Sequence, residues 1–290
     1  MNKVTQIAIH FAVLTFLFNI YSCKTAYPEF GISTIRLVND TATNTAIKRA
    51  LNALPYDDYL ANTFLCKDST TIPYRLLSPL NNEPSQKYPL IITLHNSSRI
   101  GTDNTSQLEP LARIWLDENN RTKYPAYVVA PQFATRATTY TFDQQRQIPT
   151  SKPQPPLLAI LDLVDSLKKN HNIDENRIYL VGYSMGGSSV IDLLNIRPSL
   201  FAAAVAIASV PQFENTQELR GVPIWLIHGS DDAENPFAGS AQLYRAISEQ
   251  QKTRFWIFEH RTHNNIVSPA LLGTVIPEWL FNKTRPSAPL

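Results

Sequence analysis

Short apolar runs recur along the chain and are separated by more polar segments. Six of these runs are apolar on both faces, at residues 89–94, 127–130, 178–181, 202–208, 224–227 and 255–258. Strands that are buried on both faces lie in the middle of a parallel sheet that helices cover. Two further short strands, 62–66 and 72–77, flank the polar turn at 67–70 and predict an antiparallel entry to the sheet.

The segment after Pro155-Pro156 has the spacing of an amphipathic helix. Its apolar positions recur every three or four residues, at Leu157, Ile160, Leu161, Val164 and Leu167. Proline is tolerated in the first turn of a helix, so the two prolines are compatible with a helix start. Strands that alternate with such helices form an open α/β sheet, and ligands bind beyond the carboxyl ends of its strands. We therefore expect an α/β fold, with a mostly parallel sheet flanked by helices and functional residues directly after the strands.

The first residues differ from the rest of the chain. Lys3 precedes an apolar core at residues 7–18, and this order is typical of an export signal. Residues 20–23, Ile-Tyr-Ser-Cys, are similar to a bacterial lipobox. We therefore expect residues 1–22 to be a signal peptide of the lipoprotein type and Cys23 to carry the lipid. A plain secretory signal and an uncleaved anchor are the alternatives.

This signal predicts a lipoprotein of the bacterial cell envelope, in the periplasm or on the cell surface. Residues 23–56 are largely polar, rich in Thr and Asn, and weakly patterned, so they indicate a tether that ends in a short helix near 46–54. The folded domain is then expected at residues 57–290. Only Cys66 lies within it, so no disulfide is expected.

The composition narrows the classes of function. The 290 residues are 43% hydrophobic and 17% charged, with a formal net charge of +2, which is typical of a globular protein with one large core. The sequence has no Lys or Arg cluster that would indicate a nucleic-acid groove or binding to an anionic membrane surface. It also has no metal-ligand motif, and we expect neither a metal nor an organic cofactor.

Glycine is concentrated at one site. The stretch VGYSMGGSS, residues 181–189, places three of the chain's nine glycines around Ser184. This motif follows a predicted strand and precedes an apolar helix, which is the context of a G-x-S-x-G nucleophile elbow. The turn is so sharp that side chains at positions 182 and 186 would collide with the strand and the helix. The pattern predicts Ser184 as a nucleophile, and a glycine-rich turn with a structural serine is the alternative.

A serine hydroxyl is a weak nucleophile, so it needs a base, which an acid in turn orients. After an elbow of this kind, the acid and then the histidine follow in chain order. Candidates for both follow the last two predicted strands: Asp231, Asp232 and Glu234 after the first, and His260 and His263 after the second. Spacing alone leaves the choice open, because such a triad is defined by geometry.

Several segments, in order, resemble one family. They are YPLIITLHNSSRIGTDN, the pair Pro131-Gln132, IDENRIYLVGYSMGGSS, FAAAVAIAS and VPIWLIHGSDDAENP, followed by a late histidine. Together they resemble the secreted α/β-hydrolase esterases related to polyhydroxybutyrate depolymerases, a family whose members are also named predicted peptidases. The resemblance spans about residues 62–282. It implies the α/β-hydrolase fold and a serine esterase acting on carboxylic esters, including acyl or feruloyl esters of polysaccharides, with peptidase activity as the weaker implication.

The family pattern separates the candidate residues. In its motif H-G-x-x-D-x-x-V-P the aspartate is catalytic and aligns with Asp232, while Asn235 replaces the usual valine. The family's histidine follows the last strand by several residues, which favours His263. The resemblance thus implies acyl transfer by Ser184, His263 and Asp232. A non-catalytic, surface-anchored binding protein on the same scaffold is the alternative, and the retention of all three residue types argues against it.

Acyl transfer also needs two backbone N–H donors for the oxyanion. One is expected from Met185, which follows the nucleophile, and the other from Asn96 or Ser97 in the loop at 95–98. Relatives usually have glycine at position 96, and asparagine is among the residues most tolerant of left-handed backbone angles. We therefore expect Asn96 to keep the shape of this oxyanion hole.

The remaining candidates receive structural interpretations. His95 and His228 each close a strand before a turn and are expected to bond the local backbone. Trp225 and Phe258 lie within apolar runs and are expected in the core. The segment 133–156 is expected to be a loop that sets the substrate specificity.

Overall fold

The structure, a computed structural model, describes residues 27–37, 41–67 and 69–285. The predicted export signal and the lipidation site Cys23 lie outside these residues, so both stay predictions. Within the described part of the chain, no helix is long and apolar enough to cross a membrane.

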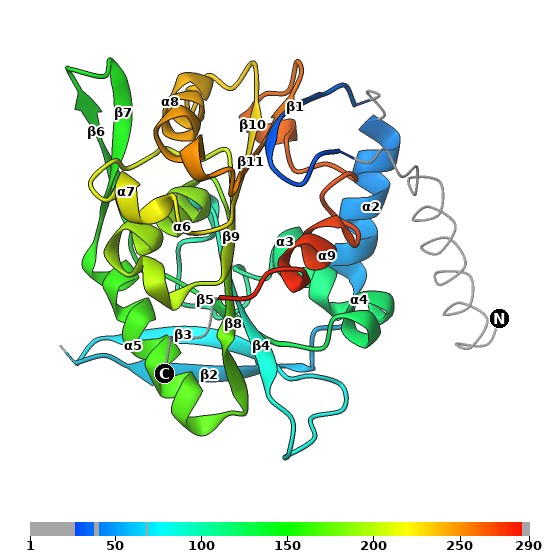
Figure 1. The fold of residues 1–290 in the computed structure, drawn as a ribbon. Helices are drawn as coiled ribbons and strands as arrows, with labels where there is room; N and C mark the ends of the chain where they lie inside the picture. Colours follow the sequence, from blue (N-terminus) through cyan, green and yellow to red (C-terminus); the bar gives the residue numbers. More distant parts are fainter. Residues whose placement is uncertain (1–26, 38–40, 68, 286–290) are drawn as a thin grey trace.

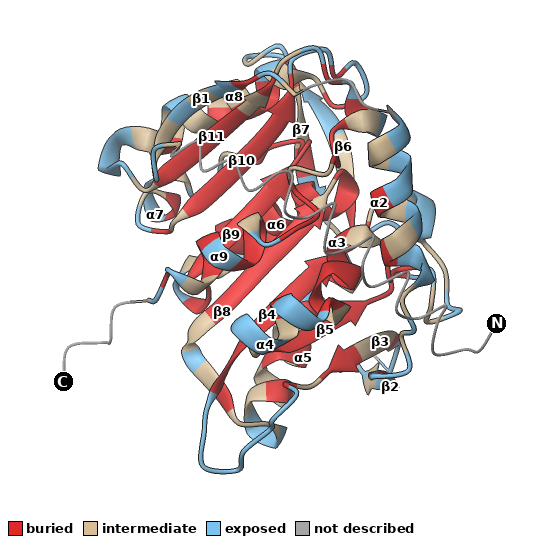
Figure 2. Ribbon diagram, turned by 90° about the vertical axis from the view of Figure 1, so that its right-hand side faces the viewer, coloured by how far each residue is buried: buried red, intermediate tan, exposed pale blue. Residues whose placement is uncertain are grey.

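A central sheet runs through the molecule, with the strand order β1-β11-β10-β9-β8-β4-β5-β3-β2 (Figure 1). Its strands are β1 (Gly31–Ile35), β2 (Tyr59–Leu65), β3 (Thr71–Leu77), β4 (Tyr88–Leu94), β5 (Tyr127–Pro131), β8 (Ile173–Tyr183), β9 (Ala203–Ile207), β10 (Ile224–Gly229) and β11 (Thr253–Phe258). Within this sheet the antiparallel pairs are β2 with β3 and β3 with β5, and the other neighbouring strands pair in parallel. The middle strands are buried along their length (Figure 2) because their side chains are apolar on both faces. The predicted α/β fold and its six buried strands are confirmed.

Helices cover both faces of this sheet (Figure 1). One layer consists of α5 (Pro155–Asn170), α6 (Met185–Ile196), α7 (Thr216–Leu219) and α8 (Phe237–Ile247). The other consists of α2 (Thr41–Ala53), α3 (Pro110–Arg113), α4 (Glu118–Lys123) and α9 (Val275–Phe281). Each layer encloses its own apolar core against the sheet. Helix α5 starts at the prolines as predicted, although its buried stripe uses Leu163 where the pattern indicated Leu161.

The segment expected as a tether belongs to the folded domain, so the predicted boundary at residue 57 is wrong. Strand β1 pairs in parallel with β11, and Gly31 lies opposite Arg254. Helix α2, longer than expected, buries Ile47 and Leu51 in the core. The sequence pattern missed β1 because an edge strand with one exposed face lacks the continuous apolar run of a central strand.

The segment 133–156, expected as a loop, contains a β-hairpin. Its strands are β6 (Thr138–Asp143) and β7 (Ile148–Pro153), which pair antiparallel outside the main sheet (Figure 1). The hydroxyls of Thr138 and Ser151 both donate hydrogen bonds to the carboxylate of Asp192 on α6. The hairpin is therefore fixed to the helix that follows Ser184, through a side chain with no solvent exposure.

This buried carboxylate predicts a pH dependence of stability. Burial raises the pKa of Asp192 from 3.8 to about 6, against the opposing hydrogen bonds from Ser151 and Thr138. The folded state therefore holds the proton more tightly than the unfolded chain. The free energy of unfolding that this proton contributes is fully present below about pH 4. It is lost as the pH rises through about 6, a decrease of about 3 kcal/mol. We expect Asp192→Asn to abolish this loss, as measured by urea unfolding across that pH range.

A matched control is Asp57→Asn, because Asp57 is exposed. The free energy of unfolding of this variant should follow the wild-type pH curve. A curve for Asp192→Asn that also runs parallel to the wild type would contradict the prediction.

Candidate active site

The turn between β8 and α6 holds Ser184 in an uncommon backbone conformation, with φ 58° and ψ −121°. A Cβ atom added to Gly186 would lie 1.9 Å from the carbonyl oxygen of Leu94, and one added to Gly182 would lie 2.3 Å from that of Gly186. No side chain fits at either position. The structure thus has the strand, sharp turn and helix that the G-x-S-x-G motif predicts.

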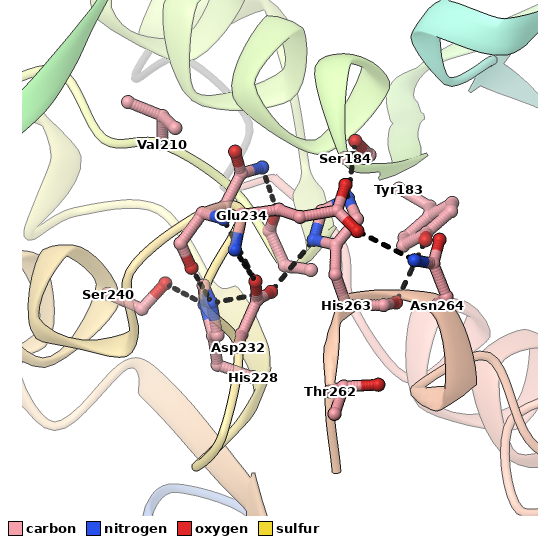
Figure 3. Close-up of polar contacts among 12 residues, drawn as sticks. Tyr183, Ser184, Val210, His228, Asp232, Glu234, Ser240, Thr262, His263 and Asn264 are labelled. Atoms are coloured by element: carbon pink, nitrogen blue, oxygen red, sulfur yellow. Dashed lines mark hydrogen bonds and ion pairs between the residues drawn. The ribbon is translucent and has the colours of Figure 1, made fainter.

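His263 lies between Ser184 and Asp232 (Figure 3). Its Nε2 atom is 2.8 Å from Ser184 Oγ, and its Nδ1 atom is 2.8 Å from Asp232 Oδ2. The carboxylate accepts the Nδ1 proton, which leaves Nε2 to accept the proton of the serine hydroxyl. All three side chains are largely buried. The structure therefore brings together the three residues that the sequence selected for nucleophile, base and acid.

The carboxylate of Asp232 is held on all sides. Its Oδ1 accepts hydrogen bonds from the backbone N–H groups of Glu234 and Asn235, at 3.0 and 2.9 Å. Its Oδ2 lies 3.2 Å from Nε2 of His228 as well as near His263. Desolvation raises the pKa of Asp232, but the hydrogen bonds from His228 and His263 outweigh it and hold this pKa well below the usual range. Asp232 is therefore an ionised acceptor at neutral pH.

His228 has a larger part in this site than its sequence position indicated. Its Nε2 faces the carbonyl oxygen of Asn235 at 2.8 Å, as expected for a bond to local backbone, and also the carboxylate of Asp232. Both partners are acceptors, so Nε2 carries a proton, and Nδ1 lies 2.7 Å from the Ser240 hydroxyl (Figure 3). A fully buried histidine thus supports the acid in addition to His263.

The other acid and base candidates form no hydrogen bond with Ser184 in the part of the chain that the structure describes. Asp231 and His260 contact each other at 3.4 Å, with half or more of each side chain exposed. Glu234 accepts a hydrogen bond from Asn264 at 2.6 Å and lies 4.0 Å from His263 Nε2, with 59% of its side chain exposed. Neither acid is positioned to bond Nδ1 of His263, where Asp232 lies.

The loop after β4 differs from its prediction. Asn96 has φ −75° and ψ 169°, an extended conformation, so the left-handed angle expected of a glycine substitute is not used. Its backbone N–H donates to Glu109 Oε2 at 3.2 Å. Glu109 was not a candidate, because nothing in its local sequence marks it. Met185 lies at the start of α6 and Ser97 in the short 3-10 helix Ser97–Arg99, and their roles as oxyanion donors stay predictions.

His95 holds the loop to the next strand, in line with its structural interpretation. Its Nδ1 lies 2.8 Å from the carbonyl oxygen of Asn96, and its Nε2 accepts the backbone N–H of Phe133 at 3.0 Å. Burial lowers the pKa of His95 to about 4, so the ring is neutral. Trp225 and Phe258 are fully buried, as expected. Among the residues that the structure describes, no three His, Cys, Asp or Glu side chains gather to hold a metal ion.

The comparisons agree with the fold described above. The model of the dienelactone hydrolase family matches residues 126–267. The crystal structure of a thermostable esterase is similar with a TM-score of 0.72 and 33% sequence identity, over 79% of this chain and 64% of that chain. The chain has the α/β-hydrolase fold.

Two curated relatives match this chain over shorter stretches. A bifunctional acetylxylan esterase/xylanase from Neocallimastix patriciarum is 33% identical over 73 residues, which are 25% of this chain and 11% of that protein. A poly(3-hydroxyalkanoate) depolymerase C from Paucimonas lemoignei is 31% identical over 124 residues, which are 42% of this chain and 28% of that protein. The matches thus span a minor part of both relatives. The second of them, a depolymerase, agrees with the family that the motifs of this chain resemble.

Proposed function

We propose that this α/β-hydrolase is a serine esterase that cleaves carboxylic esters through an acyl-enzyme. The observation that carries the proposal is the pair of hydrogen bonds that links Ser184 Oγ to His263 and His263 to Asp232. A nucleophile, a base and an orienting acid in this order perform acyl transfer on several unrelated folds. The ester-hydrolase relatives support the same class of reaction.

The proposed reaction has two steps. His263 Nε2 takes the proton of Ser184 as Oγ bonds to the ester carbonyl carbon, and Asp232 stabilises the imidazolium. The oxyanion is bound by the N–H groups of Met185 and Ser97, because Glu109 accepts the N–H of Asn96. The ester C–O bond then breaks, and the alcohol leaves with the proton from His263. A water molecule repeats the sequence on the acyl-enzyme and releases the acid.

The proposed substrates are acyl esters, including those that decorate polysaccharides. The name of the acetylxylan esterase relative supports this class, and the depolymerase relative extends it to other carboxylic esters. A panel of short acyl esters, feruloyl esters, acetylated glycans and dipeptide amides tests the proposal on the full chain. Turnover of esters over amides is expected. Cleavage of the amides alone would favour a peptidase, and no turnover of any substrate would favour a binding protein.

The two adjacent aspartates provide a sharper test of the mechanism. Asp232→Asn is expected to lower kcat for an acetyl ester by about 10^4, because an amide no longer holds His263 in the required tautomer. Asp231→Asn, the matched control, changes an exposed carboxylate and should stay within a few-fold of wild type. Steady-state kinetics measure both, and the opposite order of effects would contradict the assignment of Asp232 as the acid.

A further inference from the structure

A cleft of about 260 Å³ lies beside the chain neighbours of Ser184 and His263, although neither of these two residues lines it. Tyr183 precedes Ser184 in the chain, Asn264 follows His263, and both line the cleft. The Tyr183 hydroxyl donates a hydrogen bond to the His263 carbonyl oxygen at 2.9 Å. Asn96, from the loop after β4, lines it as well. A group bound in this cleft therefore lies close to the ester bond that Ser184 attacks.

The charges in the cleft do not cancel. Arg99 Nε contacts Glu109 Oε1 at 3.2 Å, so these two charges offset each other. Lys48, on α2, is the other cation of the lining, and it forms no ion pair with an acidic side chain in the described part of the chain. Burial alone lowers the pKa of its ammonium group. The cleft lining thus carries one half-buried positive charge without a partner.

We propose that the cleft binds a carboxylate group of the substrate through Lys48, an inference that rests on the proposed ester hydrolysis. The preferred esters then carry a free carboxylate, as acylated uronic acids do. A desolvated ammonium group is stabilised most by an ionised acceptor. One carboxylate balances the single uncompensated charge. An apolar acyl chain in the same place would desolvate Lys48 further without a hydrogen bond in return.

The amide side chains around the cleft agree with this assignment. Asn52 lies one helical turn after Lys48 on α2 and also lines the cleft, so the two side chains share one face of the helix. An amide donor beside an ammonium group matches the two oxygens of a carboxylate. Glu234 is an exposed acid that accepts a hydrogen bond from Asn264, and it does not itself line the cleft.

Two pairs of esters test the inference and locate the carboxylate. Methyl glucuronoside and methyl glucoside, acetylated at the same ring hydroxyl, differ only at C6 of the alcohol part, which is a carboxylate in the first and a hydroxymethyl group in the second. Monomethyl adipate and methyl hexanoate differ only in a carboxylate on the acyl part. We expect wild type to have the higher kcat/KM for the charged member of one pair. Lys48→Met should reduce that preference about tenfold, the worth of one hydrogen bond to a charged group, and Lys48→Arg should restore most of it.

Lys169→Met is the matched control, because Lys169 is an exposed lysine on α5 outside the cleft, and it should keep the wild-type preference. 4-Nitrophenyl acetate reports ester hydrolysis itself. The carboxylate site alone would be overturned if the chain hydrolysed this ester but showed no preference for the charged substrates. It would also be overturned if Lys48→Met left such a preference intact. Loss of turnover on every ester would overturn the proposed function and the site together.

Discussion

Ser184→Ala is expected to lower kcat for an acetyl ester by a factor on the order of 10^6, with the fold intact. Without Oγ no acyl-enzyme forms, and His263 has no hydroxyl proton to accept. His263→Ala should be about as harmful, because the nucleophile without its base is again a weak hydroxyl. The double variant should be no slower than either single one, since the two groups act as a unit. Steady-state and burst-phase kinetics on the purified chain measure these effects.

Ser189→Ala serves as the matched control for this series. Ser189 lies in the same glycine-rich motif, and its hydroxyl donates to the carbonyl oxygen of Met185 at 2.9 Å, within α6. Its loss should change turnover only a few-fold. Residual activity of Ser184→Ala within a hundredfold of wild type would show that the reaction uses another nucleophile.

Gly186→Ala is expected to damage both stability and turnover. The new Cβ would lie 1.9 Å from the carbonyl oxygen of Leu94 and 2.9 Å from that of His95, and both are backbone atoms. The end of β4 must then move, and it carries the loop with Ser97 away from the oxyanion. We expect a loss of about 3 kcal/mol in the free energy of unfolding. We also expect a drop of about 100-fold in kcat, the usual effect of a misplaced group or a lost oxyanion donor.

The control for this variant is Gly221→Ala. A Cβ on Gly221 would lie 3.4 Å from its nearest neighbour, the carbonyl oxygen of Glu218, which is ordinary contact. Urea unfolding of Gly221→Ala should stay close to wild type. If Gly186→Ala unfolded at the same urea concentration as wild type and kept its turnover, the close approach of β4 to the elbow would not matter for the site.

The strand ends could be predicted from the sequence because burial on both faces leaves a continuous apolar run. Ser184, Asp232 and His263 follow such runs, so their meeting at one edge of the sheet follows from the parallel topology. Asp232 and His263 could be separated from Asp231 and His260 only by family resemblance. The structure gives the physical difference, since one pair is buried against Ser184 and the other is exposed.

Other parts of the site depend on contacts between segments that are distant in the sequence. Glu109 meets Asn96, and Lys48 reaches the cleft from α2, yet neither residue lies in a recognisable motif. The left-handed angle expected at Asn96 was wrong because the Glu109 carboxylate binds both its backbone N–H and its side-chain amide, in an extended conformation. Such tertiary effects override local preference, and a single sequence does not encode them in its pattern.

The pairing of β1 with β11 sets an order on how the chain can fold during synthesis. Gly31 leaves the ribosome early, but its partner Arg254 follows only after nearly all of the chain. Strand β11 has β10 as its other neighbour, so the remaining sheet can assemble before β1 docks. Closing so long a loop is slow, and the uncovered edge of β11 is open to pairing with other chains until then. Folding intermediates of this protein are therefore most exposed to aggregation just before the first strand closes the sheet.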